Sequence, residues 1–158
     1  MSRIIEFYRG TATGAGRTID QALELDDIAW EAAHDIVQWV YPLPEPSRAQ
    51  PQSPVLTDED LAVFRTDPEV RETVKRAYRR WLSFMEGTDH WRRERDHNHL
   101  RITRIIRFLS LVGMHEEASD VFRIAAEGAE GIVPNTTLWY WQEAMNDRPA
   151  WLAIGSGR

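Results

Sequence analysis

The first group of residues that could do chemistry lies in residues 30–42, a stretch rich in apolar side chains. His34, Gln38 and Tyr41 follow one another at positions i, i+4 and i+7. An uninterrupted helix would therefore present an imidazole, an amide and a phenol on one face, with Asp35 beside them. Because these groups donate and accept hydrogen bonds, the face is suited to bind a polar ligand or the polar face of another helix.

The second group lies in residues 97–104, where His97, Arg101 and Arg104 have the same spacing and Asn98 follows His97. An imidazole and two guanidiniums on one helix face are suited to bind a carboxylate or a phosphate. The N-terminus of such a helix adds free N–H groups for an anion. We expect the two helices to face each other, because their polar groups then satisfy one another or a shared ligand.

The same residues also fit a purely structural role. His34 can bond to another helix and Asp35 can pair with Arg101 or Arg104, which would fix helix packing without any ligand. A metal site assembled from His34, Asp35 and His97 is a further alternative. The histidines, however, show neither an HExxH pattern nor comparable ligand spacing. We therefore expect no metal, and no cofactor is indicated.

Helical spacing of apolar residues predicts the elements that position these groups, together with the capping signals of Thr18 with Gln21 and Thr57 with Asp60. The expected helices cover residues 19–25, 27–40, 58–64, 68–87, 97–112, 116–127 and 134–146, and residues 4–8 form a short helix or an extended arm. Asp67-Pro68 is a strong start signal, since a capping residue is followed by proline at the first helical position. The apolar positions at helical spacing, which we expect to face inward, include Ile28, Val70, Val74, Ala77, Trp81, Met85, Ile102, Ile105, Ile106, Leu109, Trp139 and Trp141. The predicted fold class is all-α, an irregular bundle of about six or seven helices without strands.

A proline-rich segment, residues 42–54, contains five of the eight prolines in the chain. Proline removes backbone donors and fixes φ, so this segment should be extended and lie at the surface. Neither side of it looks large enough to be a second domain. We therefore expect a strap across the body of a single domain that covers residues 1–158.

Composition excludes several classes of protein. The 158 residues contain no cysteine, which rules out disulfides, thiolate metal sites and cysteine nucleophiles. Residues 71–107 carry 11 basic and five acidic residues, yet the whole chain has a formal charge of −6, so we expect no nucleic-acid partner. Neither an apolar run of roughly 20 residues nor a signal-peptide core is present. We expect a cytoplasmic location, and the excess of arginine over lysine is typical of a GC-rich bacterial genome.

Both polar groups lie in motifs that resemble the conserved domain of the opioid growth factor receptor family. The matching stretches are Phe-Tyr-Arg-Gly at residues 7–10, residues 31–42, the run His-Asn-His-Leu-Arg-Ile-Thr-Arg-Ile-Ile at residues 97–106, and residues 108–114. Val37 and Tyr41 stand where the family tends to have isoleucine and phenylalanine. The resemblance covers nearly the whole chain, from about residue 4 to residue 145.

The resemblance implies a receptor-like function. Eukaryotic members are described as receptors for an opioid peptide, are associated with the nucleus and its membrane, and carry further C-terminal regions. This sequence ends soon after the shared domain and has no polybasic localisation run. We therefore expect a short bacterial member, in which nuclear signalling does not transfer with the family.

We expect a helical module that binds a small polar or anionic ligand, such as a peptide or an amino-acid-like molecule. The residues expected to bind it are His34, Asp35, Gln38, Trp39, Tyr41, His97, Asn98, Arg101 and Arg104. One alternative is a small enzyme, with His34 or His97 as general base or metal ligand and Arg101 or Arg104 holding an anionic substrate. Another is a scaffold without a ligand. Homo-oligomerisation is compatible with each of these roles.

Overall fold

The computed structural model describes residues 2–155, and secondary structure in this range is helical, with no strand. The predicted all-α class is confirmed. Ten α-helices and one 3-10 helix occur in the described range, more than the predicted six or seven, because several are short. The chain divides into two compact units, Met1–Gly87 and Thr88–Arg158, and each is described by itself. No helix among residues 2–155 is long and apolar enough to cross a membrane.

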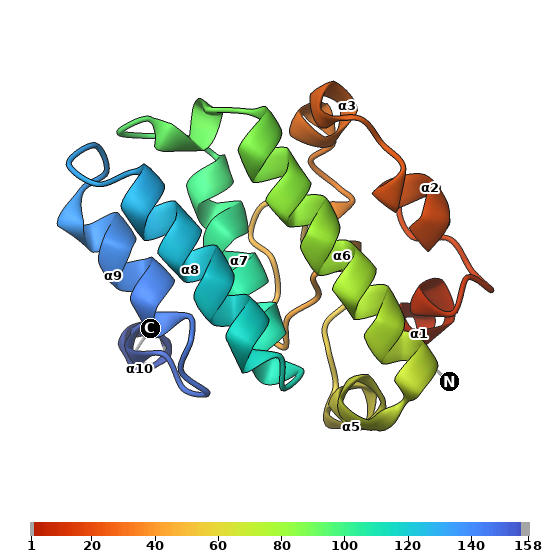
Figure 1. Ribbon diagram of the computed structural model, residues 1–158. Coiled ribbons are helices and arrows are strands. Elements are labelled where there is room, and N and C mark those ends of the chain that lie inside the picture. Colours follow the sequence, from red (N-terminus) through yellow and green to blue (C-terminus); the bar gives the residue numbers. More distant parts are fainter. Residues whose placement is uncertain (1, 156–158) are drawn as a thin grey trace. The chain divides into compact units, whose positions relative to one another are not determined.

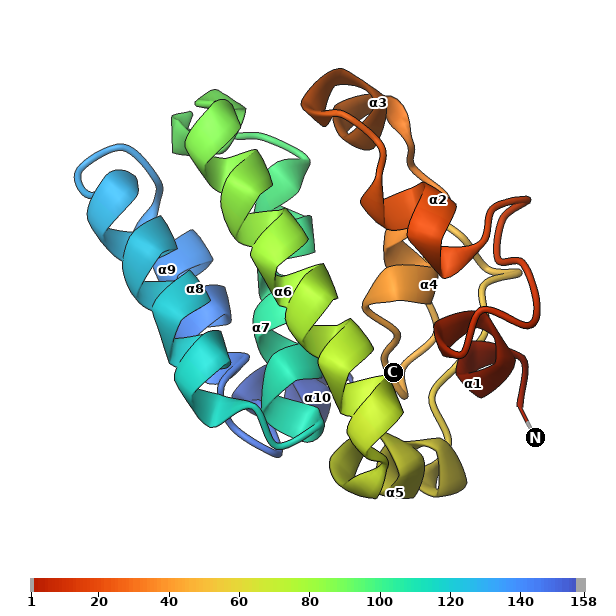
Figure 2. The same cartoon turned by 45° about the vertical axis from the view of Figure 1, so that its right-hand side comes forward.

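The first unit is organised around one long helix, α6, which covers Pro68–Gly87. The shorter helices of this unit are α1 (Arg3–Tyr8), α2 (Ile19–Leu23), α3 (Asp27–Ala32), α4 (Val37–Val40) and α5 (Asp58–Thr66). Four of these, α1, α2, α3 and α5, pack against α6 (Figure 2). The apolar stripe of α6 is buried as predicted: Val70, Val74, Ala77, Trp81 and Met85 are each at most 1% exposed.

Side-chain caps begin the short helices where the sequence predicts them. Thr18 accepts a hydrogen bond from the backbone N–H of Gln21, whose side chain bonds back to the Thr18 N–H, and this capping box opens α2. Thr57 and Asp60 make the same pair of bonds at the start of α5. Capping satisfies backbone donors that a helix start otherwise leaves without a partner. Because the capping residue and its partner are only three positions apart, such helix starts can be predicted from the sequence.

Asp67 caps α6 and makes the stability of the first unit depend on pH. Its Oδ1 accepts from the N–H groups of Glu69 and Val70, at 2.9 and 3.1 Å, and its Oδ2 lies 2.5 Å from Arg9 Nη2. The backbone bond from Val70 is the largest influence on the pKa of Asp67, and together with Arg9 it lowers this pKa below its usual 3.8.

A lowered folded-state pKa means that Asp67 stabilises the fold fully above the unfolded-state pKa. We expect this contribution to decline as the pH falls below about 4 and through the lower folded-state value. Urea unfolding measured from pH 7 to pH 2 should show a smaller pH dependence in Asp67→Asn than in the wild type, and a lower midpoint at pH 7. Asp58→Asn, an exposed change in the first turn of α5, is the control and should retain the wild-type dependence. Equal pH profiles for Asp67→Asn and the wild type would contradict the prediction.

Aromatic rings form a large part of the core of the first unit. Tyr8 lies 4.8 Å from Phe64, centroid to centroid, and Trp81 stacks on Phe84 at 5.0 Å. The Tyr8 hydroxyl donates to the carbonyl oxygen of Val40. Burial, and to a lesser extent the neighbouring Tyr41, raises the pKa of Tyr8 well above its usual value.

The helix predicted over residues 27–40 is broken, and that prediction is corrected here. Helix α3 ends at Ala32, Ala33 is extended with a ψ of 102°, and α4 begins at Val37. Ile28, expected to face inward, is 82% exposed, whereas Trp30 is fully buried. The face of α3 that packs is therefore the one that carries Trp30. In an unbroken helix His34 would follow Trp30 on this buried face; the break places His34 in solvent instead.

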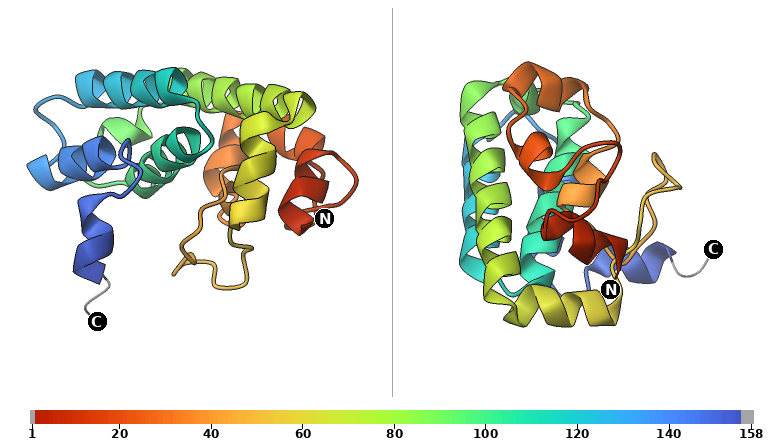
Figure 3. Two further views of the ribbon diagram at one scale, coloured as in Figure 1. Left: turned by 90° about the horizontal axis from the view of Figure 1, so that it is seen from below. Right: turned by 90° about the vertical axis from the view of Figure 1, so that its right-hand side faces the viewer.

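The proline-rich segment lies inside the first unit and not at the boundary between the units. The N–H of Leu56 donates to the carbonyl of Leu43 at 2.9 Å, so the two ends of the segment meet. The segment contains turns and no helix. It forms a closed surface loop between α4 and α5 (Figure 3), and the structure shows no strap of the predicted kind.

The second unit contains η1 (His90–Arg92), α7 (Asn98–Leu111), α8 (His115–Gly128), α9 (Asn135–Glu143) and α10 (Ala150–Gly155). Helix α7 packs against η1, α8 and α9, and α9 also contacts α10 (Figure 1). The predicted bounds of α7 and α8 agree with the structure to within one residue. Helix α9 ends three residues earlier than expected, and η1 and α10 were not predicted.

The buried face of α7 is the one that the sequence predicts, with Ile102, Ile105, Ile106 and Leu109 each 0% exposed. Gly113 ends the helix with a φ of +81°, a conformation that glycine adopts without strain. Trp141 on α9 is fully buried, as expected, but Trp139 is 37% exposed, so the prediction that Trp139 faces inward is wrong. On α9 the side that packs is therefore the one that carries Trp141.

Candidate functional site

The polar residues of the first group do not share one helix face. His34 and Asp35 lie on the connection between α3 and α4, and both are exposed. Asp35 Oδ1 is 3.7 Å from Arg17 Nη1, with side-chain exposures of 55% and 34%. An ion pair this exposed contributes little to stability. The predicted single face of His34, Gln38 and Tyr41 is thus corrected, because the helix that would have carried it is broken.

Gln38 differs from its neighbours because its side chain contains a buried oxygen atom without a hydrogen-bond partner among the described residues. The side chain is only 8% exposed, and its Oε1 atom has no hydrogen-bond partner among the described residues. An amide oxygen in such a position costs free energy unless a ligand or water bonds to it. Within the first group, Gln38 therefore has a buried amide oxygen that can accept a hydrogen bond from a ligand or from water.

Trp39 and Tyr41, which were expected to bind the ligand, lie in the core of the first unit. Trp39 packs 5.5 Å from Phe7, and the guanidinium of Arg3 lies 5.0 Å from its ring centroid. A Cβ on Gly14 would come within 2.4 Å of the Trp39 ring, so glycine is needed at that position. The hydroxyl of Tyr41 donates to the carbonyl of Ala77 at 2.8 Å. Both residues hold α4 in place.

The second group lies at the start of α7, in the second unit. His97 is the exposed N-cap residue, and its Nδ1 is 3.6 Å from Asp96 Oδ1. Asn98 is fully buried, and its N–H donates to Asp96 Oδ2 at 3.1 Å. Arg101 is 7% exposed, and its Nη1 donates to Asn98 Oδ1 at 3.5 Å, while Arg104 is half-buried. The structure therefore brings Asn98 and Arg101 together on one side of α7, with Arg104 three residues further along.

His99 and its neighbours fix the first turn of α7, and sequence reasoning did not select them. His99 Nε2 lies 2.9 Å from the carbonyl oxygen of Trp91, and the His99 carbonyl accepts from Trp141 Nε1 at 3.1 Å. A Cβ on Gly128 would come within 2.4 Å of the Trp91 ring, so α8 approaches this ring closely. No spacing signal marks these contacts, since they join four separate elements. They hold the helix turn from which Arg101 projects.

Arg107 is a second buried arginine on α7 that the sequence did not single out. It is 3% exposed, and its Nη1 donates to the carbonyl of Asp147 at 3.5 Å. A guanidinium is rarely buried unless it is paired or hydrogen-bonded. Helix α7 thus carries buried positive charge at two positions, Arg101 and Arg107.

A shallow hollow on the surface of α8 contains none of the predicted site residues. It is lined by His115, Glu116, Ser119 and Asp120. Charged and polar residues at this spacing are typical of a solvated helix face. We therefore place the candidate site at α7 and not at this hollow.

Helix α7 carries three kinds of hydrogen-bond donor that are chemically suited to an anion. Asn98 supplies an amide, Arg101 and Arg104 supply guanidiniums, and His97 supplies an imidazole at the exposed helix start. Planar guanidinium groups bind carboxylate and phosphate oxygens in a bidentate manner. The residues of the first group belong to the other unit, so the expectation that the two groups face each other stays a prediction. The alternative metal site of His34, Asp35 and His97 depends on that arrangement and also stays a prediction.

Fold and site together define a class: an all-α protein that carries a helix with buried arginines near an exposed histidine. No family model matches the chain, and no solved structure matches it. Over 115 residues it is 31% identical to the opioid growth factor receptor of Rattus norvegicus, which covers 61% of this chain. It is 30% identical to the Mus musculus receptor over 115 residues and 31% identical to the Homo sapiens receptor over 118 residues. The chain is a distant homologue of the opioid growth factor receptors.

The homology covers a small part of the relatives. This chain spans 20% of the rat protein, 18% of the mouse protein and 17% of the human protein. The expected resemblance is confirmed by the sequence identities of 30–31%. Because the chain matches only this part of the receptors, ligand binding by this chain is a proposal. The expected bacterial source stays a prediction.

Proposed function

We propose that the chain is a helical binding module for a small anionic ligand, such as a peptide carboxylate or an amino-acid-like molecule. Asn98, Arg101 and Arg104 on α7 bind the anionic group, and His97 contributes at the exposed end. The observation that carries the proposal is the burial of Arg101, at 7% exposure, beside the fully buried amide of Asn98.

Burial makes this arginine a stronger anion binder than one on the surface. Charge-assisted hydrogen bonds gain strength where water is excluded, because the local dielectric is low. Arg101 and Arg104 lie one helix turn apart, and guanidinium N–H groups suit carboxylate and phosphate oxygens. The relatives' name also favours a binding role, since a receptor is by definition a protein that binds.

Binding should depend on Arg104 in particular. We suggest isothermal titration of the full chain with three probes: a short peptide with a free C-terminal carboxylate, the same peptide amidated, and inorganic phosphate. Arg104→Met removes a guanidinium that can donate two charge-assisted bonds to a carboxylate, so the dissociation constant of this variant for the carboxylate peptide should rise about tenfold or more. The amidated peptide should bind correspondingly less well than the free acid.

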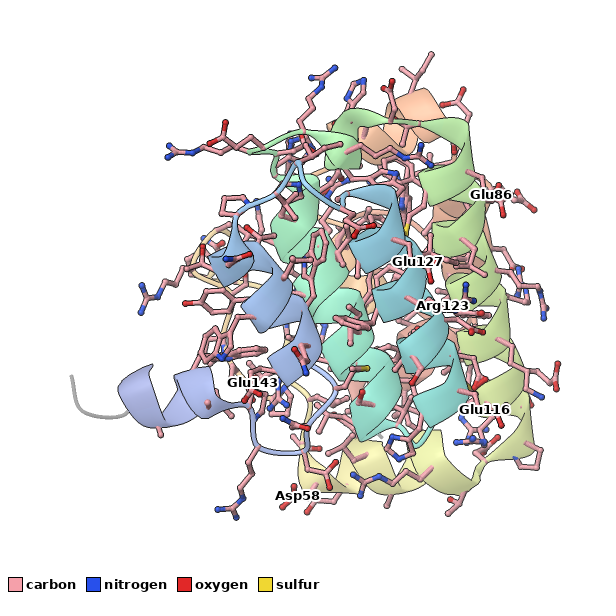
Figure 4. The ribbon with its side chains drawn as sticks, turned by 60° about the vertical axis from the view of Figure 1, so that its left-hand side comes forward. Asp58, Glu86, Glu116, Arg123, Glu127 and Glu143 are labelled. Carbon is pink, nitrogen blue, oxygen red and sulfur yellow. The ribbon has the colours of Figure 1, made fainter. Side chains whose placement is uncertain are left out.

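Arg123→Met is the matched control in the same unit. Arg123 lies on α8, 4.0 Å from Glu127, and is exposed (Figure 4). This variant also removes one positive charge, but on α8 and outside the candidate site, so it should bind the peptide as the wild type does. His97→Ala tests the exposed end of the site, and His34→Ala tests whether the first group contributes. A chain that binds neither carboxylate nor phosphate, or an Arg104→Met variant equal to Arg123→Met, would overturn the proposal. The alternative role as an enzyme stays a prediction from the sequence.

A further inference from the structure

Three aromatic side chains form a cluster on the surface of the second unit. Trp139 and Tyr140 belong to α9 and Trp151 to α10, and we call the three the aromatic patch. Trp139 is 37% exposed, Tyr140 is 44% exposed and Trp151 is half-buried, whereas the other five tryptophans of the chain are at most 5% exposed. Clustered exposed aromatic rings are typical of binding surfaces.

The three rings lie close enough together to contact one ion. The centroids are 5.0 Å apart for Trp139–Tyr140, 5.4 Å for Tyr140–Trp151 and 6.5 Å for Trp139–Trp151. The plane of Trp139 makes angles of 77° and 72° with the planes of Tyr140 and Trp151. Two rings at nearly right angles form a corner in which a small group can meet a face of each. A cation is attracted to a ring face within about 6 Å of the centroid, and one ion beside this cluster can lie within that distance of all three centroids.

The chain places its own cations over aromatic rings elsewhere, but not over this patch. Three buried tryptophans have a guanidinium over the ring, at 4.9–5.6 Å from the centroid: Trp39 with Arg3, Trp30 with Arg80 and Trp91 with Arg92. Within residues 2–155, no lysine or arginine lies in this way over a ring of the aromatic patch. The patch is therefore open to a cation from outside the chain.

A carboxylate lies beside these rings. Glu143 follows Trp139 by four positions and Tyr140 by three, so it shares their face of α9. Its Oε1 accepts a hydrogen bond from the backbone N–H of Ala150 at 2.9 Å, which places the carboxylate at the start of α10, one residue before Trp151 (Figure 4). The same bond holds α10 against α9 and so fixes the third ring next to the other two. A cation at the rings is thus close to a negative charge.

Charge and hydrogen-bonding capacity favour a cation without N–H donors. Residues 115–155, which contain α8, α9 and α10, have seven acidic and two basic residues, so this part of the chain attracts positive charge. Both carboxylate oxygens of Glu143 already accept, from Ala150 and from Asn146 Nδ2 at 3.2 Å, and an indole N–H can only donate. A primary ammonium would lose water from its three donors and find few acceptors here, whereas a quaternary ammonium has no donor to satisfy.

We infer that the aromatic patch binds a quaternary ammonium group, whose methyl groups contact the ring faces and whose charge is balanced by Glu143. Two sources carry this chemistry: free small molecules such as choline, and the trimethylated lysine side chain of another protein. The patch contains none of the residues of the anion site on α7 and takes a ligand of the opposite charge, so the inference does not depend on the proposed function.

Nuclear magnetic resonance of the indole N–H groups tests the inference on the full, nitrogen-15-labelled chain. Trp139→Phe and Trp151→Phe each remove one indole signal and so assign the two signals of the patch. Titration with choline should shift these two signals with one dissociation constant of about 10 mM or less, and leave the signals of the five buried tryptophans in place. The uncharged analogue 3,3-dimethylbutan-1-ol has the same shape and should bind at least about fivefold more weakly, because it lacks the cation–π attraction.

Two substitutions test the parts of the site. Trp139→Ala removes one ring and should raise the dissociation constant for choline about fivefold or more. Glu143→Gln removes the charge but keeps an oxygen that can accept from the Ala150 N–H, and should raise the constant about threefold. Glu116→Gln is the matched control, because it removes the same charge from an exposed position on α8, outside the patch (Figure 4). This control should bind choline as the wild type does.

Two peptides, one with a trimethylated lysine and one with the same lysine unmodified, distinguish the sources of the ligand. Tighter binding of the trimethylated peptide than of choline assigns the site to a protein partner, and the reverse order assigns it to a free small molecule; either result supports the inference. Tighter binding of the unmodified peptide than of the trimethylated one overturns it. So do equal affinities for choline and its uncharged analogue, or unshifted patch signals up to about 100 mM choline. The comparison of choline with its analogue uses the wild type, so it does not depend on the folding of any variant.

Discussion

Replacing Trp141 with alanine is expected to reduce the free energy of unfolding by about 3–5 kcal/mol. The Trp141 ring is fully buried between helices of the second unit, and its Nε1 donates to the carbonyl of His99 at 3.1 Å. The substitution removes this bond and leaves a cavity that the surrounding helices fill only in part. Urea unfolding followed by far-ultraviolet circular dichroism would measure the loss.

Trp139→Ala is a matched control on the same helix. It makes the same change of side chain two residues earlier, at a position that is 37% exposed. Its ring contacts with Tyr140 and Trp151 are partial, so we expect a loss of about 1 kcal/mol or less. Equal losses for the two variants would show that burial of Trp141 does not determine the stability of this unit.

The contact between Trp141 and His99 also connects stability to the candidate site. His99 lies in the first turn of α7, two residues before Arg101, and its imidazole is bonded to the carbonyl of Trp91. Trp91 and Trp141 thus hold this turn from two elements. The position of the Arg101 guanidinium depends on core contacts, so an anion site at α7 does not require a flexible loop to form it.

Long helices were predictable because the signals that define them are local. Helix α6 begins at the Asp67 cap and Pro68, and α7 ends before a glycine of positive φ. Caps and apolar periodicity depend on residues within a few positions of one another, so they can be found in the sequence. The two capping boxes at Thr18 and Thr57 were found in the same way.

The break between α3 and α4 could not be found from local signals. Residues 33–36 contain neither glycine nor proline, and the apolar spacing across them suits one continuous helix. Residues 36–42, however, are all buried, which no single face of a helix allows. Trp30 near the end of α3 is fully buried, and we infer that packing, and not local preference, ends this helix. Tertiary packing of this kind regularly overrides helix propensity.

Residue types at the candidate site were predictable, but their burial was not. Arg101 and Arg104 were selected because guanidiniums at helical spacing suit an anion, and Asn98 was selected because its polar amide follows His97 in the same motif. Whether a particular arginine on α7 is buried depends on which elements cover it, and those contacts are distant in sequence. Arg107 was therefore missed as a buried cation, although it belongs to the same basic stretch. His97 and His99 are alike in sequence, yet one is exposed and the other is buried.

Ile105→Ala is the second substitution for which we expect a large effect. Ile105 is 0% exposed and belongs to the apolar face of α7, which also contains Ile102, Ile106 and Leu109. Removing its branched side chain loses the transfer free energy of the buried groups and opens a cavity in a packed core. We expect the free energy of unfolding to fall by about 2–5 kcal/mol.

Leu100→Ala provides the comparison on the same helix, because Leu100 is 78% exposed. Alanine favours the helix slightly more than leucine does, and little apolar surface is exposed by the change, so stability should stay within about 0.5 kcal/mol of the wild type. Urea midpoints of both variants, measured side by side, check the prediction. If Ile105→Ala were as stable as Leu100→Ala, α7 could not be the buried helix that holds Arg101 in place, because its apolar face would then contribute no more to stability than its exposed face.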